Sequence, residues 1–177
     1  MRCFFAIPVS GEAAQVLTRT LTDLRRQYPE VRWEAPEALH LTLQFIGTWP
    51  DARLQELTAA AGGWRWLPFT LHLTALGAFP NLRRPRIVWA GAEAHPSLSA
   101  LVDGLARQLA PLGLEREARP FTPHISLARI KPGQRLGLLP AAISGALPGE
   151  EFCLYETVPG APVAQRYQVR GRFPAAA

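Results

Sequence analysis

The sequence predicts a fold of mixed strands and helices in which two related halves repeat the same order of elements. Stretches with the alternation of β-strands are separated by stretches with leucines at helical spacing. Shifting the chain by 84 residues superposes the two halves, approximately residues 2–47 and 86–131, without a gap and with nine identities. Both halves then read strand, helix, strand, so we expect two lobes that bring equivalent strands together across a pseudo-twofold axis.

The first half begins with a run of apolar residues closed by a proline, which indicates a buried strand over Arg2–Val9. Ser10 is a typical N-cap, and leucines at helical spacing extend the next helix to about Tyr28. The strand Leu39–Ile46, ended by a glycine, follows it. A weaker helix and an alternating strand complete this part of the chain, over Ala52–Ala61 and Phe69–Leu76.

The second half begins with a strand over Arg86–Ala92. Ser97 is the expected cap of a helix that ends near Leu109, and Phe121–Ile130 is the next strand, interrupted early by a proline. Two closing strands are expected on either side of a turn rich in proline and glycine, over Phe152–Val158 and Arg166–Phe173.

Two near-copies of a short motif stand at equivalent positions of the repeat. They are His40-Leu41-Thr42-Leu43 and His124-Ile125-Ser126-Leu127. Residues i and i+2 of a strand point to one face, so each motif can bury two aliphatic side chains while its imidazole and hydroxyl share the opposite face. The repeat therefore predicts a cleft with two histidines and two hydroxyls.

The other two histidines also precede a hydroxyl residue, yet neither has a counterpart in the repeat. His72 aligns with Glu156 and is interpreted as a polar residue on the solvent face of a strand. His95 aligns with Gly11 and is interpreted as a loop residue before the cap Ser97. Only His40 and His124 remain as a candidate pair.

A lone histidine on a strand is usually structural, but two in equivalent positions suit acid–base chemistry near neutral pH. One imidazole can take a proton from water while the other donates one to a departing oxygen. The hydroxyls of Thr42 and Ser126 can hold phosphoryl oxygens. The alternative of a zinc site is weaker, because no Asp, Glu or Cys stands at ligand spacing beside both motifs. No phosphate-binding glycine motif or adenylation lysine is found either, which argues against a nucleotide-activated ligase.

The composition is basic, with a net charge of +5, and Lys131 is the only lysine. Guanidinium groups suit a polyanionic partner, although GC-rich coding explains an arginine-rich chain equally well. No apolar run is long enough to span a bilayer, and the short Cys3–Val9 run is interpreted as a strand and not as a signal peptide. Cys3 and Cys153 lack metal spacing, so we expect free thiols in a reducing cytoplasm.

The chain resembles the 2H phosphoesterase superfamily, in particular the bacterial and archaeal RNA 2′,3′-cyclic phosphodiesterases, also called 2′-5′ RNA ligases. The resemblance covers nearly the whole length and includes both histidine motifs. One departure is Ser126, where the family more often has threonine, and the hydroxyl is retained. The matching segments are Arg2–Ile7, Trp33–Gly47, Phe79-Pro80, Arg86–Trp89, Phe121–Arg129, Leu154–Glu156 and Tyr167.

The resemblance implies a single bilobal α+β domain over residues 1–177, with two pseudo-symmetric lobes, each an antiparallel sheet flanked by helices, around a central cleft. It implies metal-independent, ATP-independent hydrolysis of RNA 2′,3′-cyclic phosphate ends, tRNA fragments among them, to 2′-phosphates, with 2′-5′ joining as the reverse reaction. It also implies a cytoplasmic protein, without membrane attachment or cofactor, and we expect a monomer with no obligate protein partner.

In the family pattern His40 is the proton donor and His124 the proton acceptor, although the symmetry of the motifs leaves this order open on chemical grounds. Arg129 is the expected phosphate contact. On a strictly alternating strand it points away from His124, so this role requires a local bulge or a long reach. Phe121 and Trp33 are candidates for base stacking, with burial in the core as the alternative that we favour for both.

Two other functions remain open from the sequence. One is an RNA-binding module that recognises phosphate ends without turnover, and it would show salt-dependent binding but no product. The other is an enzyme of the same mechanism that acts on 2′-5′ oligonucleotides or on small cyclic nucleotides. Identifying the products from a panel of cyclic phosphates separates these possibilities.

Overall fold

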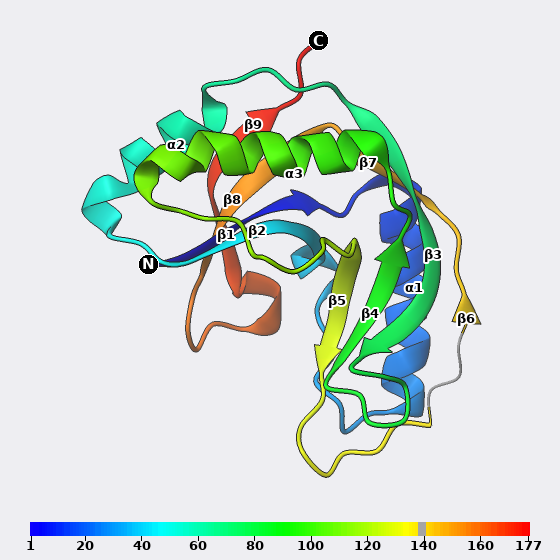
Figure 1. Ribbon diagram of the computed structural model, residues 1–177. Helices are drawn as coiled ribbons and strands as arrows, with labels where there is room; N and C mark the ends of the chain where they lie inside the picture. Colours follow the sequence, from blue (N-terminus) through cyan, green and yellow to red (C-terminus); the bar gives the residue numbers. More distant parts are fainter. Residues whose placement is uncertain (138–140) are drawn as a thin grey trace.

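The strands form one antiparallel sheet around which the helices are arranged (Figure 1). The computed structural model describes residues 1–137 and 141–177. Within these residues the strand order is β6-β3-β4-β5-β2-β1-β8-β9, and β7 pairs with β3 outside this path. The strands are β1 (Arg2–Pro8), β2 (His40–Thr48), β3 (Phe69–Phe79), β4 (Ile87–Ala92), β5 (His124–Arg129), β6 (Ala141–Ala142), β7 (Ala146–Gly149), β8 (Glu151–Thr157) and β9 (Tyr167–Pro174).

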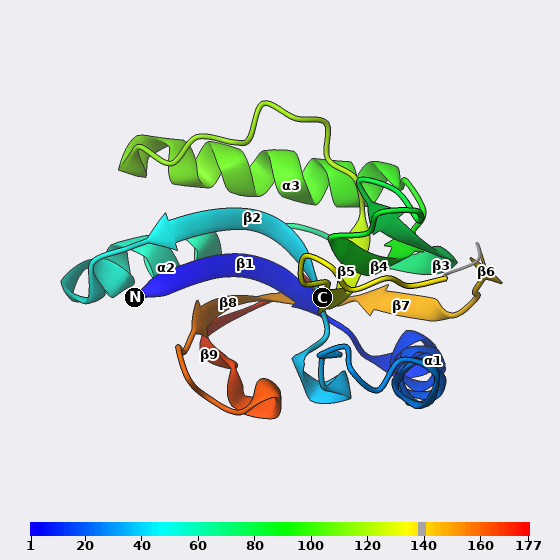
Figure 2. The same ribbon diagram turned by 90° about the horizontal axis from the view of Figure 1, so that it is seen from below.

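In the part of the chain that the structure describes, three α-helices and short 3₁₀ turns connect these strands. The α-helices are α1 (Gly11–Gln27), α2 (Leu54–Gly62) and α3 (Pro96–Leu109). The 3₁₀ turns are η1 (Pro36–Ala38), η2 (Asp51–Arg53), η3 (Ala110–Leu112) and η4 (Val163–Gln165). Figure 2 shows α3 on one side of the strands and α1 on the other, so the two long helices cover different parts of the sheet.

The centre of the sheet is the place where β2 and β5 meet. β1 and β2 form one antiparallel pair and β4 and β5 form another, each joined by a long helix. Only one register pair, Leu41 with Ile125, links β2 to β5. A bridge between Trp33 and Ala128 adds a second, isolated contact. The two halves are thus one sheet with a narrow joint, which brings the two histidine motifs side by side.

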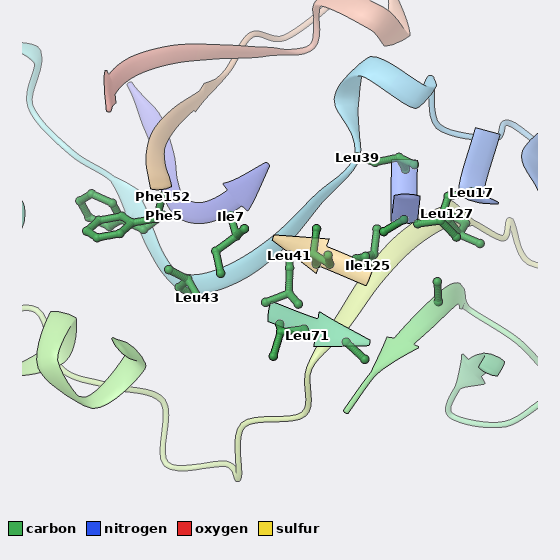
Figure 3. Close-up of a cluster of buried hydrophobic side chains, with 14 of the residues drawn as sticks. Phe5, Ile7, Leu17, Leu39, Leu41, Leu43, Leu71, Ile125, Leu127 and Phe152 are labelled. Carbon is green, nitrogen blue, oxygen red and sulfur yellow. The ribbon is translucent and has the colours of Figure 1, made fainter. Parts of the chain in front are cut away.

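The hydrophobic core uses the aliphatic residues between the polar residues of the motifs (Figure 3). Leu41, Leu43, Ile125 and Leu127 are all buried, as the alternation of the motif strands predicts. They pack in one cluster with side chains of the helices, including Leu17 of α1. Because these four side chains point into the core, the histidines and hydroxyls between them point to the opposite face of both strands.

The observed elements differ from the predicted ones at several boundaries. The strand predicted over Phe69–Leu76 extends to Phe79, and the strand predicted from Phe121 begins only at His124. Pro123 lacks an N–H to donate, which delays the pairing. The short strands β6 and β7 were not predicted, because two and four residues carry too little periodicity.

The cap of α3 is also different from the prediction. His95 and not Ser97 is the N-cap residue, and its Nδ1 accepts a hydrogen bond from the backbone N–H of Ser97 at 3.2 Å. His95 is thus the loop residue before the helix that the sequence predicted, but the prediction of Ser97 as the cap was wrong. Its ring also stacks on Phe69, with the ring centroids 5.7 Å apart, so its role is structural.

Cys3 and Cys153 are free and buried, as expected from their spacing. No helix in the described part of the chain is both long and apolar enough to cross a membrane.

Candidate active site

The two histidines stand at equivalent places, each at the first residue of its strand. Nδ1 of His40 lies 2.8 Å from the backbone oxygen of Ala38, and Nδ1 of His124 lies 2.7 Å from that of Thr122. A carbonyl oxygen only accepts, so Nδ1 carries the proton in both rings. With Nδ1 engaged in this way, Nε2 is the ring nitrogen that remains available to a ligand in both histidines.

The strand register brings the motifs together in a crossed arrangement. Because Leu41 pairs with Ile125 in antiparallel strands, Thr42 lies beside His124 and His40 lies beside Ser126. Each imidazole therefore has the hydroxyl residue of the other half as its neighbour. Burial is the main cause that lowers the pKa of His40, and the charge of a protonated His124 lowers it further.

Both motif strands contain a β-bulge after the hydroxyl residue. In β2, Thr42 pairs with Ala6 and Gln44 with Phe5, so Leu43 is an extra residue. In β5, Ser126 pairs with Trp89 and Ala128 with Val88, so Leu127 is the extra residue. Such an extra residue shifts the alternation of side chains by one position.

The burial of the side chains shows the effect of the bulges. The first six residues of β2 and the six residues of β5 have the same order of buried, half-buried and exposed side chains. Phe45 and Arg129 are exposed and stand on the same face as the histidines and hydroxyls. Arg129 thus has the local bulge that its predicted phosphate contact requires. Phe45, with 61% of its surface exposed, is its counterpart at the 84-residue offset.

Aromatic rings surround His40. The ring centroids of Phe4 and Tyr167 lie 4.7 and 4.8 Å from that of His40, and that of Tyr155 lies 5.8 Å away. Burial among these rings disfavours the charged imidazolium and lowers the pKa of His40 from 6.5 to about 4. The hydrogen bond to Ala38 opposes this change but does not outweigh it. His40 is therefore neutral at pH 7 when no ligand is bound.

Beside His124 lies a cavity of about 580 Å³, called the first cavity below. Its aromatic side chains are Phe45, Phe79 and Phe121, and the edge of Phe79 contacts His124 with the ring centroids 5.1 Å apart. Its charged lining residues are Arg86, Arg116, Glu117 and Arg119. The full lining is Thr42, Leu43, Gln44, Phe45, Phe79, Pro80, Arg86, Ile87, Val102, Arg116, Glu117, Arg119, Pro120, Phe121, Thr122 and His124.

Gln44 is a buried polar residue in the lining of the first cavity. Only 7% of its surface is exposed, and neither its amide oxygen nor its amide nitrogen has a hydrogen-bond partner among the described residues. An unsatisfied buried amide is costly, by about 1–3 kcal/mol for each group. The side chain is therefore suited to a ligand that offers both a donor and an acceptor.

The predicted site residues do not all reach the cleft. Thr42, His124 and Phe121 line the first cavity. Trp33 does not: it is buried at 5% exposure, and its indole N–H donates to the backbone oxygen of Tyr28. Burial, the favoured alternative for Trp33, is what the structure shows. His72 lies on the surface with Nδ1 2.9 Å from a carboxylate oxygen of Glu93.

Phe45 and Gln44 were missed by the sequence analysis. The repeat itself contained a signal for Phe45, since the offset that superposes the histidines also places Phe45 on Arg129. For Gln44 there was no signal, because its burial depends on the bulge. Within the described residues, no group of three or more His, Cys, Asp or Glu side chains could hold a metal ion.

Comparisons with known proteins agree with this geometry. The LigT-like phosphoesterase family model matches residues 7–89. The RNA 2′,3′-cyclic phosphodiesterase of Thermus thermophilus is 34% identical over 187 residues, which cover 97% of this chain and 91% of that protein. The enzyme of that name from Geobacillus stearothermophilus is also 34% identical, over 87% of this chain, but this chain spans only about half (51%) of its length.

A solved structure shows the same fold over nearly the whole chain. Escherichia coli LigT complexed with 3′-AMP has a TM-score of 0.77 and 31% sequence identity, and the match covers 99% of this chain and 98% of that one. The resemblance read from the two histidine motifs is thereby confirmed. The chain belongs to the LigT-like 2H phosphoesterase family.

Proposed function

We propose that this phosphoesterase hydrolyses RNA 2′,3′-cyclic phosphate ends to 2′-phosphates, with His40 and His124 as an acid–base pair that needs no metal. The observation that carries the proposal is the crossed arrangement of two imidazoles and two hydroxyls around one cleft. The names of the relatives, RNA 2′,3′-cyclic phosphodiesterases, support the choice of substrate.

The reaction is an in-line displacement at the cyclic phosphorus. Nε2 of His124 takes a proton from water as the new P–O bond forms, and the protonated Nε2 of His40 donates a proton to the leaving 3′-oxygen as the P–O3′ bond breaks. The product carries a 2′-phosphate and a 3′-hydroxyl. The hydroxyls of Thr42 and Ser126 and the guanidinium of Arg129 hold the non-bridging oxygens, where negative charge builds up.

The low pKa of His40 bears on the order of these roles. A neutral imidazole cannot donate the proton that the 3′-oxygen requires, so in this scheme His40 takes up a proton when substrate binds. A phosphodiester anion beside the ring favours the imidazolium and raises its pKa. Binding of the substrate and protonation of the acid are then one coupled event, and substrate affinity increases as the pH falls toward the pKa of free His40.

The first cavity is the place for the terminal nucleoside. Its exposed Phe45 and half-buried Phe121 offer aromatic faces on which a base can stack. The amide of Gln44 offers one acceptor and two donors to the edge of the base. Stacking is tolerant of sequence, whereas an amide selects for a matching edge, so we expect Gln44 to set the base preference.

The test is product identification on a defined RNA with a 2′,3′-cyclic phosphate end, in the presence of EDTA. We expect a 2′-phosphate product, unaffected by the chelator, and almost none with His40→Ala or His124→Ala. Circular dichroism of both variants serves as the control for folding.

Other outcomes would point elsewhere. Binding of the RNA without any product indicates the non-catalytic RNA-end module, and loss of turnover with EDTA contradicts the metal-free mechanism. Cleavage of 2′-5′-linked oligonucleotides or of small cyclic nucleotides, tested in the same panel, would widen or replace the substrate class. The same panel with a 5′-hydroxyl RNA added detects 2′-5′ joining as the reverse reaction.

A further inference from the structure

A second cavity, of about 560 Å³, opens where β5 ends. Beyond the single pair that joins the motif strands, β2 continues past His124 toward Phe45, and β5 continues past His40 toward Arg129. Phe45 lines the first cavity and Arg129 lines the second. The two cavities therefore flank the histidine pair on opposite sides.

The second cavity is strongly basic. Four cationic side chains line it, from Arg32, Arg129, Lys131 and Arg166, against the single carboxylate of Glu34. In contrast to the first cavity, its lining contains no aromatic residue. The rest of the lining is Ile130, Pro132, Thr157, Val158, Pro159, Gly160 and Ala161.

Glu34 neutralises only part of this charge. Its Oε1 accepts a hydrogen bond from Arg166 at 2.7 Å, in an ion pair that is mostly buried. Burial raises the pKa of Glu34, and the charges of Arg166, Arg32 and Arg129 oppose that rise. No carboxylate in the described part of the chain pairs with Arg32, Arg129 or Lys131. Three cations thus remain in excess around the cavity.

The cavity begins at the catalytic face. The bulge at Leu127 turns Arg129 toward the side of the strand that carries His124 and Ser126. Lys131 follows just after the end of β5, and Arg32 comes from the segment whose Trp33 bridges to Ala128. A group of cations next to the residue that contacts the reacting phosphate suits a second phosphate of the same ligand. Guanidinium forks suit the two non-bridging oxygens of a phosphodiester.

We propose that the second cavity is a subsite for the internucleotide phosphate on the 5′ side of the cyclic end, so that the enzyme prefers oligonucleotides to mononucleotides. The inference rests on the proposed function, since it presumes that the cyclic end lies between the histidines. The aromatic first cavity takes the terminal base, and the basic second cavity takes the backbone that leads away from it.

The experiment compares three substrates that end in the same cyclic phosphate. They are cytidine 2′,3′-cyclic monophosphate, a dinucleotide with a normal phosphodiester linkage, and the same dinucleotide with a neutral methylphosphonate linkage. Values of kcat/KM are measured for the wild type and for the double variant Arg32→Gln/Lys131→Gln. Arg107→Gln is the matched control, because Arg107 is exposed on α3 and lines neither cavity.

We expect the wild type and the control to favour the phosphodiester dinucleotide over the mononucleotide by about 10-fold or more, as two charged hydrogen bonds imply. The double variant should lose most of this preference while hydrolysing the mononucleotide as the wild type does. The methylphosphonate dinucleotide should behave like the mononucleotide. Added salt should weaken the dinucleotide preference of the wild type more than that of the variant.

Equal kcat/KM values for mononucleotide and dinucleotide in the wild type would overturn the subsite. So would a preference that survives the neutral linkage, because a second nucleoside and not its phosphate would then be recognised. A parallel loss of all substrates in the double variant also contradicts it. If the wild type hydrolyses none of the three, it is the proposed function that fails.

Discussion

β2 and β5 share a histidine, a hydroxyl and a bulge, but they differ in the residue that the bulge turns into the cleft. In β2 this residue is Phe45, and in β5 it is Arg129. An aromatic face suits a base, and a guanidinium suits a phosphate. In the proposed site, one differing position in each of two similar strands therefore distinguishes a side that binds the base from a side that binds phosphate.

The largest effect is expected from replacing either histidine, and a second substrate should show which of them is the acid. Each alanine variant should lower kcat on an RNA cyclic end by about 10²–10⁴-fold, the usual worth of one acid or base. On bis(p-nitrophenyl) phosphate, whose leaving group needs no proton, His40→Ala should retain far more of the wild-type rate than His124→Ala. Initial rates on both substrates provide the measurement. If His124→Ala retains more of the wild-type rate on this substrate than His40→Ala does, then His124 is the acid and His40 the base.

The burial of His40 should also be measurable as stability. Its folded pKa of about 4 lies below the ordinary 6.5, so between these values the unfolded chain binds the proton and the folded protein does not. The free energy of unfolding should therefore fall by about 3 kcal/mol as the pH drops from above 6.5 to 4.

The measurement is urea denaturation from pH 4 to 8 of the wild type and of His40→Gln, which has no titratable group at this position. The difference between the two curves isolates the contribution of His40. Parallel curves over the whole range would show that the ring is not shielded from solvent as the aromatic contacts suggest.

A smaller effect should distinguish Arg129 from Phe45. Arg129→Gln should lower kcat/KM by about 10–100-fold and by the same factor for all four cyclic mononucleotides, because it removes a charged contact to phosphate. Phe45→Ala should remove about 1–3 kcal/mol of stacking, with a larger loss for purines than for pyrimidines. Steady-state kinetics on the four nucleotides gives both results. If kcat/KM falls by the same factor for all four nucleotides in both variants, the proposed difference between a base contact at Phe45 and a phosphate contact at Arg129 is contradicted.

The sequence was sufficient to predict that the strands of His40 and His124 lie side by side, because the repeat and the periodicity agree there, while the catalytic role of the pair stays a prediction. His40 and His124 follow the repeat, and the aliphatic residues between the polar ones, such as Leu41 and Ile125, are buried as alternation requires. The element order followed from the same signals. The predicted roles of Thr42, Ser126 and Arg129 remain to be tested by the kinetics above.

Features that depend on distant pairing were beyond the sequence. The bulge at Leu127 arises from how β5 pairs with β4, and strict alternation alone directs Arg129 away from the cleft. The cap of α3 is similar, since His95 competes with the better cap former Ser97 and takes the position through its contacts. The second cavity combines residues from three separate stretches of the chain, and no local pattern joins them.

The joint between Leu41 and Ile125 connects β2 to β5 through a single register pair, so few backbone hydrogen bonds hold the sheet together at its centre. The relative position of the two halves, and with it the separation of the two imidazoles, is held mainly by the buried core that both halves share. The bridge between Trp33 and Ala128, and the hydrogen bond from the backbone N–H of Glu34 to the backbone oxygen of Leu127, add backbone contacts between the halves. The alignment of the two imidazoles therefore depends on side-chain packing shared by both halves, and not on a continuous ladder of backbone hydrogen bonds between β2 and β5.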